Sequence, residues 1–218
     1  MISNQSETVS VLLATYNTAF ELTKRAIDSV LTQDYSNFEI LLLDDGSDCQ
    51  TGIEILKYCQ EHENKITYLR HQNAGQSNII NKAISLCSGS FVCVIDADDQ
   101  YKPNHISTCV AAMKNFDLVA SLTETIVDSD SDFYVPNKYN TQENVHVDEC
   151  ILFATLFGKI EVFKTIDFKT MYGADSEFFE QASKKFKVAK LNSRTYMYYR
   201  NHSNSITATL KLQQAELS

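Results

Sequence analysis

Short apolar runs alternate with longer amphipathic segments along the first half of the chain. The runs at residues 9–14 (VSVLLA), 38–43 (FEILLL), 66–69 and 91–95 (FVCVI) are bounded by polar residues, which predicts buried strands. Between them, segments 18–31, 51–61 and 76–87 carry apolar residues at helical spacing. Thr18 and Glu21 form a capping-box pattern, which predicts the start of the first helix.

The second half of the chain has a weaker pattern. A helix is expected from about Pro103, and a strand at residues 117–122. Residues 124–149 are polar and are interpreted as a long loop or excursion, which is expected to be mobile or to contact an acceptor. The remaining expectations are an apolar stretch at residues 151–157, a helix at 176–186, a strand at 188–191 and a further extended piece at 194–200.

Strands that alternate with helices predict the fold class. We expect an α/β domain with a mostly parallel central sheet flanked by helices on both faces. In such sheets the ligand site lies beyond the carboxyl ends of the strands. The absence of a linker-like segment or an internal repeat favours a single domain over residues 1–218.

Composition and charge narrow the class of protein. With 19 basic and 28 acidic side chains, the formal net charge of -9 would repel a nucleic-acid backbone. The 6 cysteines include no Cys-x-x-Cys pair, which favours reduced thiols. No apolar run approaches the roughly 20 residues of a membrane helix. We therefore expect a cytoplasmic protein, whose association with the cytoplasmic face of a membrane would require its surface or a partner.

Two acidic clusters follow predicted strands. Residues 96–99 (DADD) place alternating carboxylates at the end of a strand, and such clustered charge favours a bound divalent cation such as Mg²⁺ or Mn²⁺. The alternative is a solvated turn that caps the next helix. Residues 44–48 (DDGSD) have the composition of a tight turn, which is the competing interpretation. Their carboxylates would also suit hydrogen bonds from a nucleobase imide or a ribose.

The motifs together resemble a known family. The order and spacing of segments 14–17 (ATYN), 44–47 (DDGS), 73–77 (NAGQS) and 96–99 (DADD) are similar to those of family 2 glycosyltransferases with the GT-A fold. Segment 173–179 (GADSEFF) resembles the family's Glu-Asp-x-Glu-Leu segment, and 199–205 (YRNHSNS) resembles its closing Tyr-Arg-x-His segment. The resemblance extends over residues 9–206.

This resemblance implies roles for particular residues. It makes Asp175 the general base, and Asp98 and His202 the metal ligands. Asp45 would contact the base of the nucleotide, with Asp44 beside it. The residues implied in nucleotide-sugar binding are Thr15, Tyr16, Asn17, Asp44, Asp45, Gly75, Asp96, Ala97, Asp98 and Arg200. The nucleotide-sugar half would cover about residues 1–122, and the acceptor and catalytic half about 123–218.

The implied activity is an inverting transfer of a hexose or N-acetylhexosamine from a UDP-sugar to a saccharide or glycolipid acceptor, with Mn²⁺ or Mg²⁺. Such a reaction belongs to surface polysaccharide or glycolipid assembly. Two positions depart from the family pattern, since Ile80 stands where many relatives have arginine and Ala174 replaces a glutamate. The alternatives are a sugar nucleotidyltransferase and a non-catalytic domain that binds nucleotide sugars.

Overall fold

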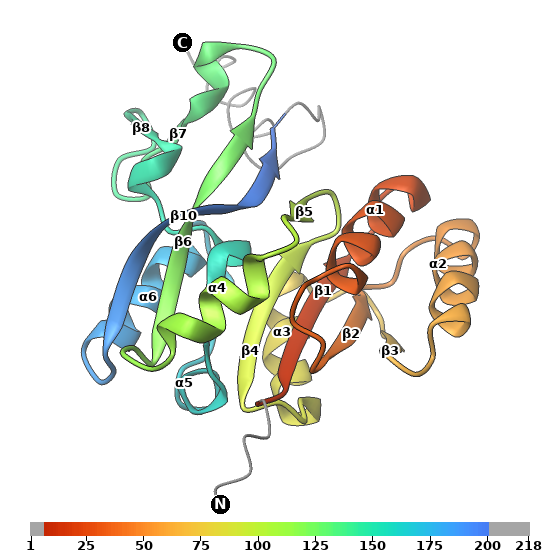
Figure 1. Ribbon diagram of the computed structural model, residues 1–218. Coiled ribbons are helices and arrows are strands. Elements are labelled where there is room, and N and C mark those ends of the chain that lie inside the picture. The colour runs from red at the N-terminus through yellow and green to blue at the C-terminus, as the bar shows by residue number, and fades with distance from the viewer. Residues whose placement is uncertain (1–6, 201–218) are drawn as a thin grey trace, which may run out of the picture.

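The computed structural model describes residues 7–200, which form one central sheet with helices on both faces (Figure 1). The sheet has eight strands in the order β3-β2-β1-β4-β9-β6-β10-β5. Their bounds are β1 Val9–Thr15, β2 Phe38–Asp44, β3 Ile66–Arg70, β4 Phe91–Asp96, β5 Gln100–Tyr101, β6 Leu118–Ile126, β9 Leu156–Lys159 and β10 Val188–Tyr199.

Most strand pairs in this sheet are parallel. β3, β2, β1 and β4 form one parallel block, and β6 and β10 form a second. Strand β9 lies antiparallel between β4 and β6 and joins the two blocks. Within the first block the register pairs Thr15 with Asp44 and Ala14 with Asp96, so the motif residues that follow these strands emerge at the same edge. The predicted α/β class with a mostly parallel sheet is confirmed.

Two hydrophobic cores lie on opposite faces of the sheet because successive side chains of a strand point to opposite sides. On β1, Val11 and Leu13 belong to one core and Leu12 to the other. The first core is covered by α1 Phe20–Leu31, α2 Cys49–Glu61 and α4 His105–Ala112. The second is covered by α3 Gln76–Ala83, α5 Ile160–Thr165 and α6 Ala174–Ser183 (Figure 1).

The segment expected to be one long polar loop is only partly irregular. Strand β6 continues to Ile126, and the strands β7 Tyr134–Pro136 and β8 Asn144–His146 form a separate antiparallel pair. Within residues 7–200, four short 3₁₀ turns complete the fold: η1 Ile84–Leu86, η2 Asp130–Phe133, η3 Val147–Glu149 and η4 Phe153–Thr155. The expectation of a long loop or excursion is therefore only partly confirmed, because cross-strand pairing at Val135 and Val145 gives this polar excursion a small sheet of its own.

Three expected boundaries were also wrong. Helix α1 begins at Phe20 after an Ala19 cap, and the amides of Leu22 and Thr23 bond to the Ala19 carbonyl, so the Thr18 capping box does not form. Helix α6 begins at Ala174, because its cap, Gly173, adopts the left-handed conformation. The two extended pieces expected at residues 188–191 and 194–200 form the single strand β10, whose pairing with β6 shifts register between positions 191 and 196.

Candidate active site

A cavity of about 1130 Å³ opens beyond the carboxyl ends of β1, β2 and β4 and is closed on its other side by the β7–β8 hairpin and α6. It brings together sequence segments that lie far apart in the chain. The predicted site residues that line it are Thr15, Tyr16, Asp45, Gly75, Asp96, Ala97, Asp98, Asp175 and Arg200. Asn17 and Asp44 are not among its lining residues, and His202 lies outside the described residues.

Asp45 organises the loop before α3. Its carboxylate accepts hydrogen bonds from the amides of Ala74 at 2.9 Å and Gly75 at 2.8 Å, and from the side chain of Asn73 at 3.2 Å. Gly75 has φ 86°, a conformation that disfavours other residues, and it caps α3. An ionised carboxylate offers about four acceptor positions. The loop occupies three of them, which leaves Asp45 room for one further donor from the cavity.

Asp44 serves the turn rather than the cavity. Its side chain is fully buried and accepts a hydrogen bond from the Ser47 amide at 2.8 Å and another from the Tyr68 hydroxyl, while Arg70 forms an ion pair with it at 3.4 Å. Asn17 ties the neighbouring loop to the same turn, because its side-chain oxygen accepts from the Asp48 amide at 2.7 Å. These two predicted binding residues therefore shape the edge of the site from behind.

The glycine of the same turn is required for close packing. Gly46 has φ 82°, and a Cβ there would lie 2.8 Å from the amide nitrogen of Asn73. Any other side chain would push the turn away from the loop that Asp45 holds. The DDGS segment is therefore both a turn and part of the cavity wall, so the two interpretations of the sequence are compatible.

The aspartates at the end of β4, Asp96, and in the loop that follows it, Asp98 and Asp99, have different surroundings. Burial, and then the charge of Asp98, raise the pKa of Asp96 to about 7, although the Gln76 side chain donates a hydrogen bond to it at 2.6 Å. Asp99 is buried in the lining of the cavity and accepts hydrogen bonds from the Tyr196 hydroxyl at 2.6 Å and the Tyr199 amide at 2.8 Å. Burial also raises its pKa well above the usual range. Asp99 thus joins the aspartate loop to β10.

Asp175 lies in the first turn of α6 and lines the cavity. It accepts a hydrogen bond from the Ser176 amide at 2.7 Å, and the Phe153 amide also favours its charged form. Burial raises its pKa, while these amides act in the opposite direction. The charge of Asp175 also contributes to the raised pKa of Asp96, which places the two carboxyl groups in one electrostatic environment.

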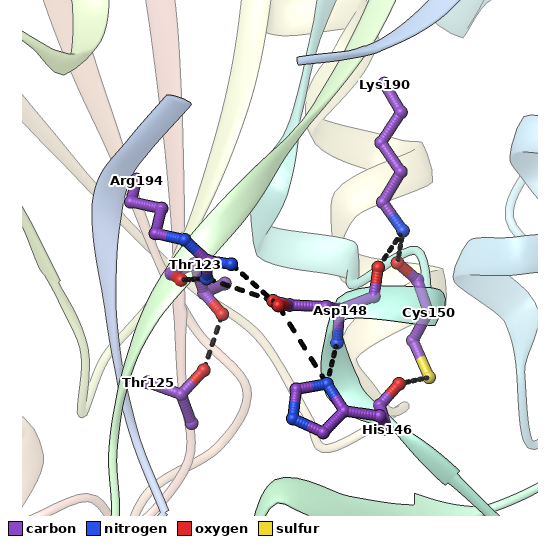
Figure 2. A network of polar contacts seen from close by, with 7 residues as sticks. All are labelled: Thr123, Thr125, His146, Asp148, Cys150, Lys190 and Arg194. Atoms are coloured by element: carbon purple, nitrogen blue, oxygen red, sulfur yellow. Dashed lines mark hydrogen bonds and ion pairs between the residues drawn. The ribbon is translucent and has the colours of Figure 1, made fainter. Parts of the chain in front are cut away.

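Residues 149–154 form a wall of the cavity beside Asp175. Figure 2 shows how β10 holds the start of this wall: Arg194 forms a two-pronged ion pair with Asp148, at 3.0 and 2.6 Å, and the Lys190 ammonium donates to the carbonyls of Asp148 and Cys150. The sequence carried no signal for these contacts, because they join β10 to a segment that lies far from it along the chain.

The match to known sequences decides the family. The family model described as "Glycosyl transferase family 2" matches residues 10–200, which is most of the chain. The chain belongs to glycosyl transferase family 2. This confirms the family suggested by the motifs.

Curated family 2 relatives match parts of the chain. Glycosyltransferase GlyA of Streptococcus pneumoniae is 31% identical over 136 residues, which cover 62% of this chain and 17% of the relative. The putative colanic acid biosynthesis glycosyl transferase WcaA of Escherichia coli is 39% identical over 106 residues, covering 47% of this chain and 37% of the relative. The chain therefore matches well under half the length of these two relatives.

Solved structures share the fold of this family 2 chain. TarS 1–349 of S. aureus in complex with UDP-GlcNAc has a TM-score of 0.70 at 19% identity, covering 93% of this chain and 60% of that one. The mannosyltransferase PcManGT of Pyrobaculum calidifontis, in complex with GDP-Man and Mn²⁺, has a TM-score of 0.71 at 17% identity, covering 95% and 61%. The fold is of the GT-A type. No helix within residues 7–200 is long and apolar enough to cross a membrane.

The family implies a divalent metal, and the site fits one that is shared with a diphosphate. Within the described part of the chain, no group of three His, Cys, Asp or Glu side chains is placed to coordinate a metal ion by itself. Mg²⁺ in nucleotide sites typically takes one or two carboxylates and completes its shell with phosphate oxygens and water. Asp98 suits this arrangement because it lines the cavity. Its backbone carbonyl, not its carboxylate, accepts the hydrogen bond from Arg25.

Proposed function

We propose that the protein is an inverting glycosyltransferase that moves a sugar from a UDP-sugar to a saccharide or glycolipid acceptor, with a divalent metal and Asp175 as general base. One observation carries the proposal: Asp45, Asp96, Asp98 and Asp175, from three separate segments, line the same cavity. Residues 1–122 would hold the donor, and residues 123–218 would supply the base and the acceptor contacts.

The donor side is argued from Asp45. Its remaining acceptor position suits the imide N–H of uracil, a donor that cytosine lacks at the same ring position. Tyr16, whose side chain is 54% exposed at the cavity edge, offers an aromatic face beside the nucleoside. Among the structural neighbours, TarS was solved with UDP-GlcNAc and PcManGT with GDP-Man, so a nucleotide-sugar donor is common to both.

The diphosphate would lie near Asp98 and Arg200, both of which line the cavity. Asp98 would hold the metal, with His202 as a second ligand from beyond the described residues. The metal, when bound, would neutralise charge on the departing diphosphate. The guanidinium of Arg200 would bind a phosphate oxygen through charge-assisted hydrogen bonds.

Asp175 has the chemistry and the burial that a general base requires. In an inverting transfer the acceptor hydroxyl loses a proton as its oxygen attacks the anomeric carbon, opposite the bond to the diphosphate. A base works best when its pKa is close to the operating pH. Burial raises the pKa of Asp175 in that direction, and Asp175 lines the same cavity as Asp45 and the end of β1. Asp175 would therefore take the proton.

A nucleotide panel tests the proposal. The purified protein is titrated with UDP, CDP and GDP, each with and without Mn²⁺, and its melting temperature is recorded, because a ligand that binds only the folded state stabilises it by mass action. We expect the largest stabilisation with UDP and Mn²⁺, followed by UDP release from a UDP-sugar. Pyrophosphate-dependent formation of UTP would indicate a sugar nucleotidyltransferase, and binding without turnover would indicate a non-catalytic domain. A preference for GDP would refute the UDP assignment alone.

A further inference from the structure

The wall of the cavity beside Asp175 is held by two side chains of β10, Lys190, which lines the cavity, and Arg194, which does not. Arg194 and Asp148 do not line it, whereas residues 149–154 do. The ion pair between them is bidentate, and one Arg194 nitrogen also donates to the Thr123 carbonyl on β6 (Figure 2). Arg194 therefore anchors Asp148 to the central sheet at a fixed angle, as planar guanidinium–carboxylate pairs do.

The backbone of the wall receives a second set of contacts. The Lys190 ammonium donates to the Cys150 carbonyl at 2.7 Å and to the Asp148 carbonyl (Figure 2). The Asp148 amide in turn donates to His146 Nδ1 at 3.1 Å, which fixes the entry to η3. Two side chains of β10 thus hold a short segment that belongs to no sheet.

The irregularity in β10 explains how Arg194 reaches this position. Pairing between β10 and β6 shifts register between Leu191 and Tyr196, and Arg194 lies within that interval. Such irregularities redirect side chains and are common beside active sites. Lys190 precedes the shift and is still in the first register with β6, whereas Arg194 lies within the shifted interval.

The wall ends at the carboxyl group that matters most for the proposed reaction. Three residues after Cys150, Phe153 lines the cavity together with Asp175, and its amide lowers the pKa of the Asp175 carboxyl group. The anchored segment therefore forms part of the surroundings of the side chain proposed as the base. A shift of the wall would move both the acceptor surface and an amide that acts on Asp175.

We propose that Arg194 is a positioning residue, which acts through Asp148 to hold residues 149–154 in register with Asp175. The inference rests on the proposed function, since it assigns Asp175 as the base. The pair is substantially exposed, with side chains 46% and 30% accessible. Exposed ion pairs contribute little to the free energy of unfolding. If this pair had no role beyond stability, its loss would therefore leave both the melting temperature and kcat nearly unchanged. A positioning pair would change kcat far more than the melting temperature.

The test compares Arg194→Met, Asp148→Asn and the double variant with the parent. The matched control is Lys159→Met, which breaks the Lys159–Asp117 pair, whose side chains are 44% and 29% exposed and which lies outside the cavity. We expect kcat for UDP release to fall about tenfold or more in each Arg194 and Asp148 variant, because small misplacements in an active site are costly. The double variant should be no worse than the single ones, Arg194→Lys should recover part of the loss, and UDP affinity should stay within about twofold.

Hydrogen exchange gives a readout that does not need turnover. The peptide containing the Phe153 amide should exchange at least about tenfold faster in Arg194→Met than in the parent and in Lys159→Met. Unchanged exchange in this peptide would overturn the inference even if the protein transfers no sugar. A parent and an Arg194→Met variant with equal kcat would also overturn it, provided that Asp175→Asn is impaired. Loss of UDP release in every protein, with the exchange difference intact, would refute the proposed function and leave the anchoring role standing.

Discussion

The substitution Asp175→Asn separates a base from a helix-stabilising residue. Asparagine keeps an oxygen that accepts from the Ser176 amide, a contact of 2.7 Å, and removes only the charge and the basic oxygen. The lost interaction between a carboxylate and the first turn of α6 is worth about 0.3–1 kcal/mol. Burial disfavours the charged form, as the raised pKa indicates, and this offsets that loss. We therefore expect a melting temperature within about 4 °C of the parent.

The rate should respond much more strongly. A general base contributes about 10²–10⁴-fold, which corresponds to about 3–5 kcal/mol of transition-state stabilisation at 1.36 kcal/mol per tenfold. The assay is steady-state release of UDP from a UDP-sugar, with UDP affinity measured by calorimetry as a check that the donor half is intact. UDP affinity should be unchanged because Asp175 is proposed to act on the acceptor and not to bind the nucleotide.

A matched control comes from the same helical turn. Glu177→Gln also removes a carboxylate from the first turn of α6, but Glu177 bonds to Gln181 at 2.8 Å and does not line the cavity. This variant should keep parental turnover. If a folded Asp175→Asn protein turns over at nearly the parental rate, Asp175 is not the base. Equal losses in the two variants would show that the helix, rather than one carboxyl group, is responsible.

Three further predictions concern the metal, the nucleobase and acid stability. Asp98→Asn should abolish the gain in UDP affinity that Mn²⁺ provides, measured by calorimetry, while the fold persists; an unchanged Mn²⁺ effect would refute the ligand assignment. The parent should bind UDP about tenfold or more tightly than CDP, because a hydrogen bond to a charged group contributes about 1.5–3 kcal/mol. Asp45→Asn should bring this ratio of affinities toward one. A ratio equal to the parent's would contradict the contact between Asp45 and the uracil imide. Burial lowers the pKa of His105 to about 3, so the stability that depends on its neutral form is complete above pH 6.5 and is lost as the pH falls. The free energies of unfolding of the parent and of His105→Gln are measured in urea at pH 6.5 and at pH 4.5. The difference between the two proteins should shrink by about 2–3 kcal/mol over this range, at 1.36 kcal/mol per pH unit. A constant difference would contradict the prediction.

The sequence by itself determined the first parallel block and the positions of its motifs. The runs that became β1, β2, β3 and β4 are short, apolar and separated by helical patterns, so local hydrophobicity identifies them. Parallel strands place their carboxyl ends at one edge, which is why segments 14–17, 44–47 and 96–99 could be expected to meet there. These are consequences of local pattern and of a general rule of sheet geometry.

Only the tertiary structure decided what each carboxylate faces. Adjacent in sequence, Asp44 turns into a buried contact with Arg70, whereas Asp45 holds the Gly75 loop at the cavity. Asp99 bonds to Tyr196 and Tyr199 across roughly half the length of the chain. No local pattern encodes these choices, because each depends on which side chain arrives from a distant strand.

The second half of the fold depends most on long-range pairing. Strand β9 is only four residues long and has its place between β4 and β6 because both of its edges find partners there. The β7–β8 hairpin is polar and gives no clear alternation in sequence, yet it closes the cavity opposite the first block. Asp175 reaches the same cavity as Asp96 only after these pieces have packed. The sequence thus identified the chemical groups, while packing between distant segments set their geometry.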